Sequence, residues 1–398
     1  MASLRKIVDS GLCLGCGLCA AVARRDVMRI SPDGFRIPDT GEISPEEGRV
    51  ISAICPSVHL KAVSESDSSW GPALKSVKAW AADPVTRFRA SSGGLVSALA
   101  IYLLETGQVD AILHVKSSDG LLKNELGISR TRDEVLSGCA SRYAPAAVFD
   151  RIREIMASSD ERYCFIGKPC DIAGLVNFEK AYPEYRGRVR FRIAIFCAGV
   201  PSASASMEAV RQLDYPSGTP AAIRYRGEGW PGQFSVRYSD GEVRSMSYGA
   251  SWGKVLGRSL GLRCKICPDG TGALADISAG DAWETANGYP DFTERDGINF
   301  AIARSESGLR ILSEASDSGY IVAEEADTAS LDSIQPSQYQ RNLRSPWRIL
   351  GVRIATGIRF DFGKYASWSR MRRYPLVSGI KECLGTVRRC ISHKGGKR

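Results

Sequence analysis

The sequence predicts an α/β or α+β fold: a small cysteine-bearing N-terminal module, a larger mixed α/β domain with an antiparallel meander, and a basic C-terminal tail. Four of the twelve cysteines lie within the first 55 residues, helical and strand-like hydrophobic patterns alternate over residues 80–215, and Lys and Arg dominate after residue 340. At 398 residues the chain is long enough to bury a full core. The predicted boundaries are 1–65 for the module, 66–79 for a linker, 80–335 for the α/β domain and 336–398 for the tail.

Each element of the α/β domain has its own signal. Residues 92–107 (SGGLVSALAIYLLETG) have helical spacing and end at a glycine suited to a helix C-terminus. Apolar runs predict strands at 109–115, 162–170 and 189–199, with a helix over 171–182. Residues 221–248 alternate around glycine turns and predict the antiparallel meander, whereas 251–261 has helical spacing. A further α/β stretch runs to about residue 335.

The stretch GLCLGCGLC places Cys13, Cys16 and Cys19 two residues apart from one another. A [4Fe–4S] cluster needs soft thiolate ligands around a compact cube, and a C-x2-C-x2-C loop supplies three of them from one short piece of backbone. The fourth usually comes from a remote Cys-Pro, which Cys55 and Pro56 provide. Zinc is the alternative, but zinc sites usually pair two C-x2-C units. The module is therefore predicted to be ferredoxin-like and to hold one [4Fe–4S] cluster.

Five central cysteines are candidates for a second cluster. Two form a C-x2-C pair, two follow predicted strands and one lies in a loop; they are Cys264 and Cys267, Cys170 and Cys197, and Cys139. Strand ends of an α/β sheet converge on one crevice, so four of these thiols are expected to meet there. The alternative is buried structural cysteine, as we expect for Cys164 and consider for Cys383 and Cys390.

Two further motifs favour a phosphate-bearing redox cofactor. Ser91, Ser92, Gly93 and Gly94 precede a predicted helix, where free N–H groups and the helix dipole favour an anion, although ordinary helix capping is the alternative. Lys168 stands at a strand end, and YRGEGWPGQF supplies Arg226 and Trp230 for a phosphate and a flat ring. Clusters move single electrons, so chemistry on an organic substrate needs a flavin to bridge one- and two-electron steps. No G-x-G-x-x-G motif is present.

The net charge of +9 is concentrated in the tail. Residues 340–398 hold 15 basic and two acidic residues, which leaves 38 basic and 42 acidic residues elsewhere. Nucleic-acid binding by the whole protein is therefore not expected. The tail favours contact with an anionic membrane surface or an acidic partner, the alternative being a solvated tail.

The sequence predicts a cytoplasmic protein, peripheral at the inner face of the membrane if the tail binds lipid. The N-terminal residues contain no apolar run of the kind that forms a signal peptide, and no apolar stretch is long enough to span a bilayer. A reducing compartment favours metal-ligating or reactive cysteines over disulfides.

Six ordered motifs resemble the coenzyme F420 hydrogenase/dehydrogenase beta-subunit family, which also includes 7-hydroxymethyl chlorophyll a reductase and bacterial members of polysaccharide gene clusters. The resemblance covers roughly residues 5–310 through ASSGGLVSALAIYLLETGQVDAIL, FIGKPCDIAGL, IAIFCAGVPS, YRGEGWPGQF, CKICPDGTGALADISAGDAWE and RDGINFAIAR. It implies a flavoprotein with FAD and [4Fe–4S] clusters. Carried over, Cys13, Cys16, Cys19 and Cys55 match the ferredoxin motif; Cys170, Cys197, Cys264 and Cys267 match central-domain cysteines; and Ser92, Gly93, Gly94, Lys168, Arg226 and Trp230 fall in motifs around the flavin.

The expected function is an iron–sulfur flavoprotein oxidoreductase. It would pass electrons between reduced coenzyme F420 or ferredoxin and an organic substrate through FAD, and the bacterial family members suggest polysaccharide biosynthesis. The alternatives are an electron-transfer subunit that docks on a partner enzyme without its own substrate site, and a zinc-stabilised binding module. Catalytic residues are not identified: Asp171, Asp276, Asp281 and Glu284 adjoin the cysteine motifs, but capping or surface roles are favoured for each.

Overall fold

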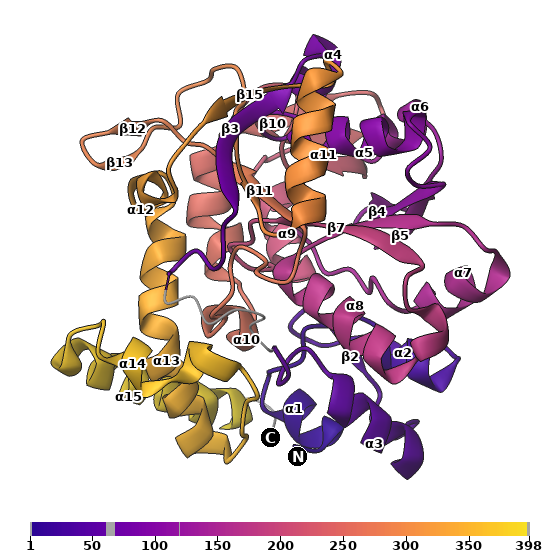
Figure 1. Cartoon of the computed structure of the whole chain (residues 1–398). Helices are drawn as coiled ribbons and strands as arrows, with labels where there is room; N and C mark the ends of the chain where they lie inside the picture. Colours follow the sequence, from indigo (N-terminus) through magenta and orange to yellow (C-terminus); the bar gives the residue numbers. More distant parts are fainter. Residues whose placement is uncertain (1, 61–67, 119, 396–398) are drawn as a thin grey trace.

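The protein is built on one large mixed sheet, seen in the computed structural model of Figure 1, which describes residues 2–60, 68–118 and 120–395. The sheet has eight strands in the order β15-β3-β14-β11-β7-β6-β4-β5. These strands are β3 (Lys75–Ala81), β4 (Ala111–Ser117), β5 (Asn124–Ser129), β6 (Tyr163–Gly167), β7 (Val189–Ile195), β11 (Ile277–Asp281), β14 (Asn299–Ala303) and β15 (Ile321–Glu325). The central pairs β4–β6, β6–β7 and β7–β11 are parallel, and the outer pairs are antiparallel. The predicted mixed α/β architecture is confirmed.

Helices cover both faces of the sheet because its central strands bury alternate residues on opposite sides. On one face, Ile112 and Cys164 pack with α5 (Leu95–Glu105) and α11 (Glu306–Asp317). On the other face, Leu113 and Phe165 pack with α7 (Ile152–Ser158) and α8 (Pro169–Ala181). Further short helices are α4 (Pro84–Arg89), α6 (Arg132–Ser137), α9 (Ala203–Arg211) and α10 (Leu262–Lys265).

The N-terminal module lies against the α8 face of the sheet (Figure 1). It contains α1 (Leu4–Asp9), α2 (Leu18–Ala23), the hairpin of β1 (Met28–Ile30) and β2 (Arg36–Pro38), and α3 (Pro45–Ile54). Helix α3 begins with a capping box in which Ser44 and Glu47 exchange hydrogen bonds. Leu18 and Ile54 enter the same apolar cluster as Phe165, so the module shares a core with the α/β domain.

The predicted linker over 66–79 differs from the structure. Residues 66 and 67 lie outside the described residues, but 75–79 form the first part of β3. The strand signal is weak in the sequence because the buried positions of KSVKAWA are Val77, Ala79 and Ala81, of which two are small. Its pairing partners, β14 and β15, are more than 200 residues away, so no local pattern indicates the pairing.

The meander is confirmed, whereas the predicted helix over 251–261 is wrong. Strands β8 (Pro220–Arg224), β9 (Phe234–Tyr238) and β10 (Val243–Met246) form a three-stranded antiparallel sheet. The next residues form only a π-helical turn, Gly249–Gly253, and a 3-10 turn, Leu256–Arg258. Glycine has low helix propensity, and the glycines of this stretch favour short turns over a continuous helix. The small hairpin of β12 (Thr285–Ala286) and β13 (Tyr289–Pro290) follows later in the chain.

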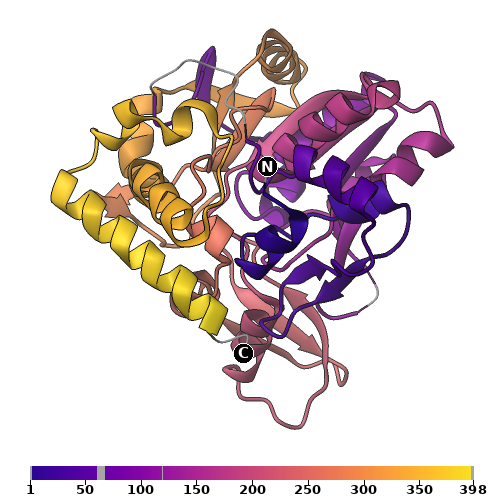
Figure 2. The same ribbon diagram turned by 90° about the horizontal axis from the view of Figure 1, so that it is seen from below.

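The last 63 residues fold onto the rest of the chain as far as they are described. They form α13 (Pro336–Thr356), α14 (Trp368–Met371) and α15 (Leu376–Gly395), after the short α12 (Leu331–Ile334). Asn342 Nδ2 donates to the Pro268 carbonyl at 3.0 Å, which ties α13 to the segment that carries the C-x2-C pair. Figure 2 shows α15 at the edge of the molecule beside α13. Within the described part of the chain, every helix is too short or too polar to cross a bilayer.

Candidate functional site

The first four cysteines meet where the N-terminal loop and the end of α3 come together. Cys13 and Cys16 lie in the loop, Cys19 is on α2 and Cys55 directly follows α3. The loop can make this turn because Gly15 and Gly17 have positive φ of 66° and 87°. A β-carbon on Gly15 would lie 2.6 Å from the Arg36 carbonyl, so the site also requires the small residue.

The thiols of this first cysteine set face one another inside the protein. Burial raises the pKa of the Cys13 thiol to about 12, against a hydrogen bond from the Gly15 N–H. Burial also raises the pKa of Cys16 and Cys19 well above its usual value, and the charges of the other cysteines of the set raise it further. Four buried thiolates repel one another unless cations lie between them. The donor set therefore fits an iron–sulfur cluster, which supplies those cations.

Four of the five central candidates form a second cysteine set. Cys170 is in the first turn of α8, Cys197 follows β7, and Cys264 and Cys267 are in and after α10. Burial, with the charges of Cys264 and Cys267, raises the pKa of Cys197 to about 12. Burial likewise raises the pKa of Cys170, to which the charges of Cys197 and Cys267 also contribute. Thiols from three separate parts of the chain therefore lie close enough for their charges to interact.

The two cysteine sets are neighbours, and Asp171 lies between them. Its carboxylate is buried, and its charge helps to raise the pKa of both Cys16 and Cys170. Lys168 Nζ donates to Asp171 Oδ2 at 2.6 Å. The sequence assigns Lys168 to the flavin motifs, and the structure places it beside Cys170 and Cys197, where its positive charge lowers their pKa.

Arg263 is a second link between the sets that the sequence analysis missed. Its side chain is 1% exposed, and its guanidinium donates to the Ser57 carbonyl at 2.7 Å and the Pro56 carbonyl at 3.3 Å. Its positive charge lowers the pKa of both Cys55 and Cys264. The signal available in the sequence is its position directly before the C-x2-C pair.

Two features fit the two cysteine sets to iron–sulfur clusters: each set offers thiolates, and the thiols of each set lie near one another. Among residues 2–60, 68–118 and 120–395, no three His, Cys, Asp or Glu side chains are close enough to hold a single metal ion.

The other four cysteines lie outside both cysteine sets. Cys164 is inside β6, Cys383 and Cys390 are on α15, and the Cys139 thiol donates to the Arg89 carbonyl at 3.5 Å.

An aromatic cluster, of which Trp230 and Trp283 are buried, adjoins the second cysteine set. Phe196, directly before Cys197, packs with Trp230 and Trp283. The two indole rings stack with centroids 4.6 Å apart and planes at 4°. Tyr248 and Phe292 pack against Trp283. These five residues are called the aromatic cluster below.

Asp281, at the end of β11, ties the aromatic cluster to the turn at 226–231. Arg226 is 3% exposed and donates to both oxygens of Asp281, at 2.9 and 3.0 Å, and to the Pro231 carbonyl at 2.8 Å. Trp230 Nε1 donates to Asp281 Oδ1 at 2.7 Å. The sequence assigns Arg226 to a phosphate, but its guanidinium is already matched by Asp281 within the protein.

The Ser91–Gly94 loop lies close to the same turn. A β-carbon on Gly227 would lie 2.8 Å from the Arg89 carbonyl, and Ser141 Oγ donates to Ser91 Oγ at 2.9 Å. Ser92 Oγ donates to the Ile298 carbonyl at 3.2 Å. Asn299 Oδ1 accepts the Leu95 N–H at 3.2 Å, so one group at the start of α5 is already satisfied by the protein.

Three cations form what we call the basic cluster: Arg89, which precedes this loop, and Lys116 and Arg142 near the 138–142 loop. Burial lowers the pKa of Lys116 and of Arg142, and the buried Arg142 Nε has no hydrogen-bond partner. The described residues provide no ion pair to any of the three. With the charges of Lys116 and Arg142 added to its burial, the pKa of His114 falls to about 4, so this imidazole is neutral near pH 7. The cluster is therefore suited to an anion from outside the chain.

The basic cluster was not predicted from the sequence. Arg89 stands two residues before Ser91, so its position in RASSGG was a usable signal. Arg142 and Lys116 join only because the 138–142 loop folds over β4: a β-carbon on Gly138 would lie 3.2 Å from Lys116 Cε.

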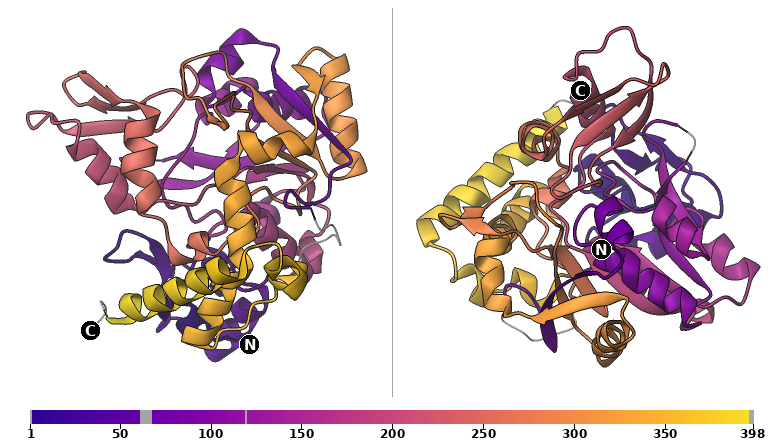
Figure 3. Two further views of the ribbon diagram at one scale, coloured as in Figure 1. Left: turned by 90° about the vertical axis from the view of Figure 1, so that its left-hand side faces the viewer. Right: turned by 90° about the horizontal axis from the view of Figure 1, so that it is seen from above.

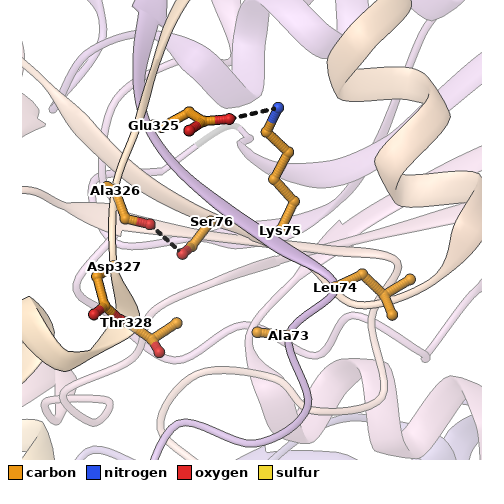
Figure 4. Close-up of a pocket in the computed structure, with 8 residues that line it drawn as sticks. All are labelled: Ala73, Leu74, Lys75, Ser76, Glu325, Ala326, Asp327 and Thr328. Carbon is orange, nitrogen blue, oxygen red and sulfur yellow. Dashed lines mark hydrogen bonds and ion pairs between the residues drawn. The ribbon is translucent and has the colours of Figure 1, made fainter.

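Figure 4 shows a surface pocket. It sits between the start of β3 and the residues that follow β15, where Lys75 and Glu325 form an ion pair of 3.6 Å. Its lining is Ala73, Leu74, Lys75, Ser76, Glu325, Ala326, Asp327 and Thr328. None of the predicted site residues is among them.

Comparison with known families defines the class of protein. The family model for the coenzyme F420 hydrogenase/dehydrogenase beta subunit N-terminus matches residues 76–153, and the model for the C terminus of the same subunit matches 160–329. Together they cover more than half of the chain. The chain belongs to the coenzyme F420 hydrogenase/dehydrogenase beta-subunit family, a family of oxidoreductase subunits, as the sequence motifs predicted.

Individual relatives are distant. The chain is 23% identical over 275 residues to the coenzyme F420 hydrogenase subunit beta of Methanosarcina barkeri, covering 68% of this chain and 86% of that one. It is 24% identical over 242 residues to the F420-dependent formate dehydrogenase 1 subunit beta of Methanococcus maripaludis, covering 61% of this chain and 59% of the relative. A chain of the F420-reducing [NiFe] hydrogenase complex from Methanosarcina barkeri has a similar fold, with a TM-score of 0.55, 22% identity, and coverage of 72% of this chain and 95% of that chain.

Proposed function

We propose that the protein is an iron–sulfur flavoprotein oxidoreductase that passes electrons between reduced coenzyme F420 or ferredoxin and an organic substrate through FAD. The observation that carries this proposal is the pair of adjacent four-cysteine sets, Cys13, Cys16, Cys19 and Cys55 and Cys170, Cys197, Cys264 and Cys267. Each set supplies the four thiolates that one [4Fe–4S] cluster needs.

The sites lie near one another in series through the protein. Asp171 and Arg263 connect the two cysteine sets, and Phe196 connects the second set to the aromatic cluster. The turn at 226–231 then contacts the loop that carries Arg89. This order of sites supports single-electron transfer between a cluster at each cysteine set and a flavin beside the Arg89 loop.

The basic cluster and the Ser91–Gly94 loop are the residues that we assign to FAD. Arg89, Lys116 and Arg142 would neutralise the phosphates, and the Ser91 hydroxyl and the glycine backbone offer further donors. When bound, a flavin would exchange a hydride with an organic partner and single electrons with the clusters. The buried aromatic residues nearby exclude water from that reaction.

Replacing Lys116 and Arg142 together by glutamine is expected to lower flavin affinity by at least tenfold, because each charge-assisted contact to a phosphate contributes about 1.5–3 kcal/mol. Flavin and iron per chain are measured on the same purified sample. The control is Arg132→Gln, which removes an exposed cation paired with Glu105. Unchanged flavin content in the double variant would show that the phosphates bind elsewhere.

Electron entry is tested by mixing the anaerobic, oxidised protein with reduced coenzyme F420 or, separately, with reduced ferredoxin. At least one donor is expected to bleach the flavin and cluster absorbance, with two electrons consumed per flavin and one per cluster. A protein that holds flavin and iron but is reduced by neither donor would contradict the proposed donors. A protein without flavin or iron would contradict the oxidoreductase itself.

A second candidate is an electron-transfer subunit with no substrate site of its own. The names of two relatives favour it, since the F420 hydrogenase and formate dehydrogenase chains are each the beta subunit of a larger enzyme. Turnover of an organic substrate by the purified chain alone would exclude it. The suggested role in polysaccharide biosynthesis stays a prediction from family resemblance, and glycan precursors belong among the substrates screened.

A further inference from the structure

Helix α15 carries an exposed stripe of large aliphatic side chains. Their exposed fractions range from 45% to 67%, and the residues are Leu376, Val377, Ile380, Leu384 and Ile391. On a helix with 3.6 residues per turn they fall on a single arc. Figures 2 and 3 show that α15, in yellow, runs along the outside of the molecule. We call this arc the α15 stripe.

The opposite side of α15 already has its packing partner. Cys383 and Thr386 are buried against α13, and a β-carbon on Gly351 of α13 would lie 2.5 Å from the Cys383 carbonyl. A β-carbon on Gly379 would likewise clash with the Trp347 ring of α13. The α15 stripe is thus a second apolar face, and helices with a single packing partner normally keep that face polar.

The charge around the α15 stripe is positive. Lys381 and Arg388 are exposed, and the helical wheel places both at one edge of the arc. The one acidic residue of α15, Glu382, faces α13, where it accepts a hydrogen bond from Arg348 Nε at 2.8 Å and pairs with Arg344 at 3.7 Å. No carboxylate of α15 therefore opposes an approaching anion.

We propose that the α15 stripe docks this protein on the surface of an anionic lipid bilayer. Aliphatic side chains would enter the boundary between headgroups and acyl chains, while Lys381 and Arg388 would meet the anionic headgroups. A lipid surface fits this arc because its aliphatic side chains are bordered by cations and α15 turns its one carboxylate toward α13. The lipid contact is independent of the proposed cofactors.

The test is co-sedimentation of the full-length protein with phosphatidylcholine vesicles, with and without phosphatidylserine. The wild-type protein is expected to bind the phosphatidylserine vesicles more tightly. Leu384→Glu should weaken that binding by at least tenfold. Lys381→Gln with Arg388→Gln should weaken binding to anionic vesicles by about fivefold per cation and leave the weak binding to neutral vesicles unchanged. Val243→Glu, at an exposed residue of β10, is the matched control and should change neither.

Three results would overturn the proposal. The first is wild-type protein that fails to sediment with either vesicle. The second is Leu384→Glu binding as tightly as the control. The third is a concentration-dependent dimer, detected by analytical ultracentrifugation without vesicles, that Leu384→Glu abolishes, because the stripe would then belong to an interface between two copies. Since the substituted side chains are exposed, unchanged circular dichroism is expected to show that each variant folds.

Discussion

Replacing Cys264 and Cys267 together by alanine is expected to halve the iron and acid-labile sulfide of the anaerobically purified protein, from about eight to about four atoms of each per chain. Both thiols belong to the second cysteine set, and the loss of two of four ligands leaves two iron atoms of the cluster without a protein ligand. The first set comes from the loop after α1, from α2 and from the residue after α3, and it keeps all four of its thiols. Iron and sulfide analysis of one sample measures the effect.

The matched control for this variant is Cys164→Ala. Cys164 is fully buried inside β6, and it belongs to neither cysteine set. Iron is expected to stay at about eight per chain, with a small loss of stability from the cavity. If the double variant kept about eight irons, the second set would not hold a cluster. Flavin measured on the same sample distinguishes local loss of a cluster from general unfolding, which would remove both.

Asp281→Ala is expected to lower the free energy of unfolding by about 3–5 kcal/mol, because it leaves the buried Arg226 guanidinium without its anion. The substitution also removes the acceptor of the Trp230 Nε1 hydrogen bond at 2.7 Å. The turn at 226–231 would then lose its attachment to β11, and flavin content is expected to fall with stability. The urea midpoint of unfolding and the flavin content are the measurements.

Two further variants sharpen this second prediction. Asp240→Ala removes an exposed carboxylate that accepts a hydrogen bond from Tyr215, and it is expected to cost less than about 1 kcal/mol. Adding Arg226→Met to Asp281→Ala is expected to restore part of the loss, since the buried charge is then absent. An Asp281→Ala midpoint equal to that of Asp240→Ala would show that the pair is not a structural anchor.

Local spacing indicates the first cysteine set, because three of its thiols lie within seven residues and the fourth precedes a proline. The structure places these four cysteines near one another, and their binding of a cluster stays a prediction. The second set needed more than spacing. The order of strands brings Cys170 and Cys197 to neighbouring parallel strands. Only the folded chain places Cys264 and Cys267 near Cys197, and it places Cys139 beside Arg89 and Arg142 instead. Spacing alone leaves five candidates, and the family resemblance selects Cys170, Cys197, Cys264 and Cys267 among them.

Charged residues were harder to assign than cysteines, because a cation in a sequence does not show which anion it meets. Lys168 and Arg226 are both candidates for phosphate in the sequence, yet each pairs with an aspartate of the protein, Asp171 and Asp281 respectively. The sequence does not indicate that Arg142 and Lys116 lie together, because the loop that brings them together is positioned by contacts with β4. Strand β3 is hard to predict for a related reason: its pairing partners, β14 and β15, lie at the other end of the domain.

The most direct test of the account is an anaerobic purification followed by iron, sulfide, zinc and flavin analysis of the wild-type chain on one sample. The account predicts about eight irons, about eight sulfides and one FAD per chain, with zinc absent. About four irons with FAD would restrict the account to the first cysteine set. Zinc without iron or flavin would contradict it and leave a metal-stabilised binding module in place of an oxidoreductase.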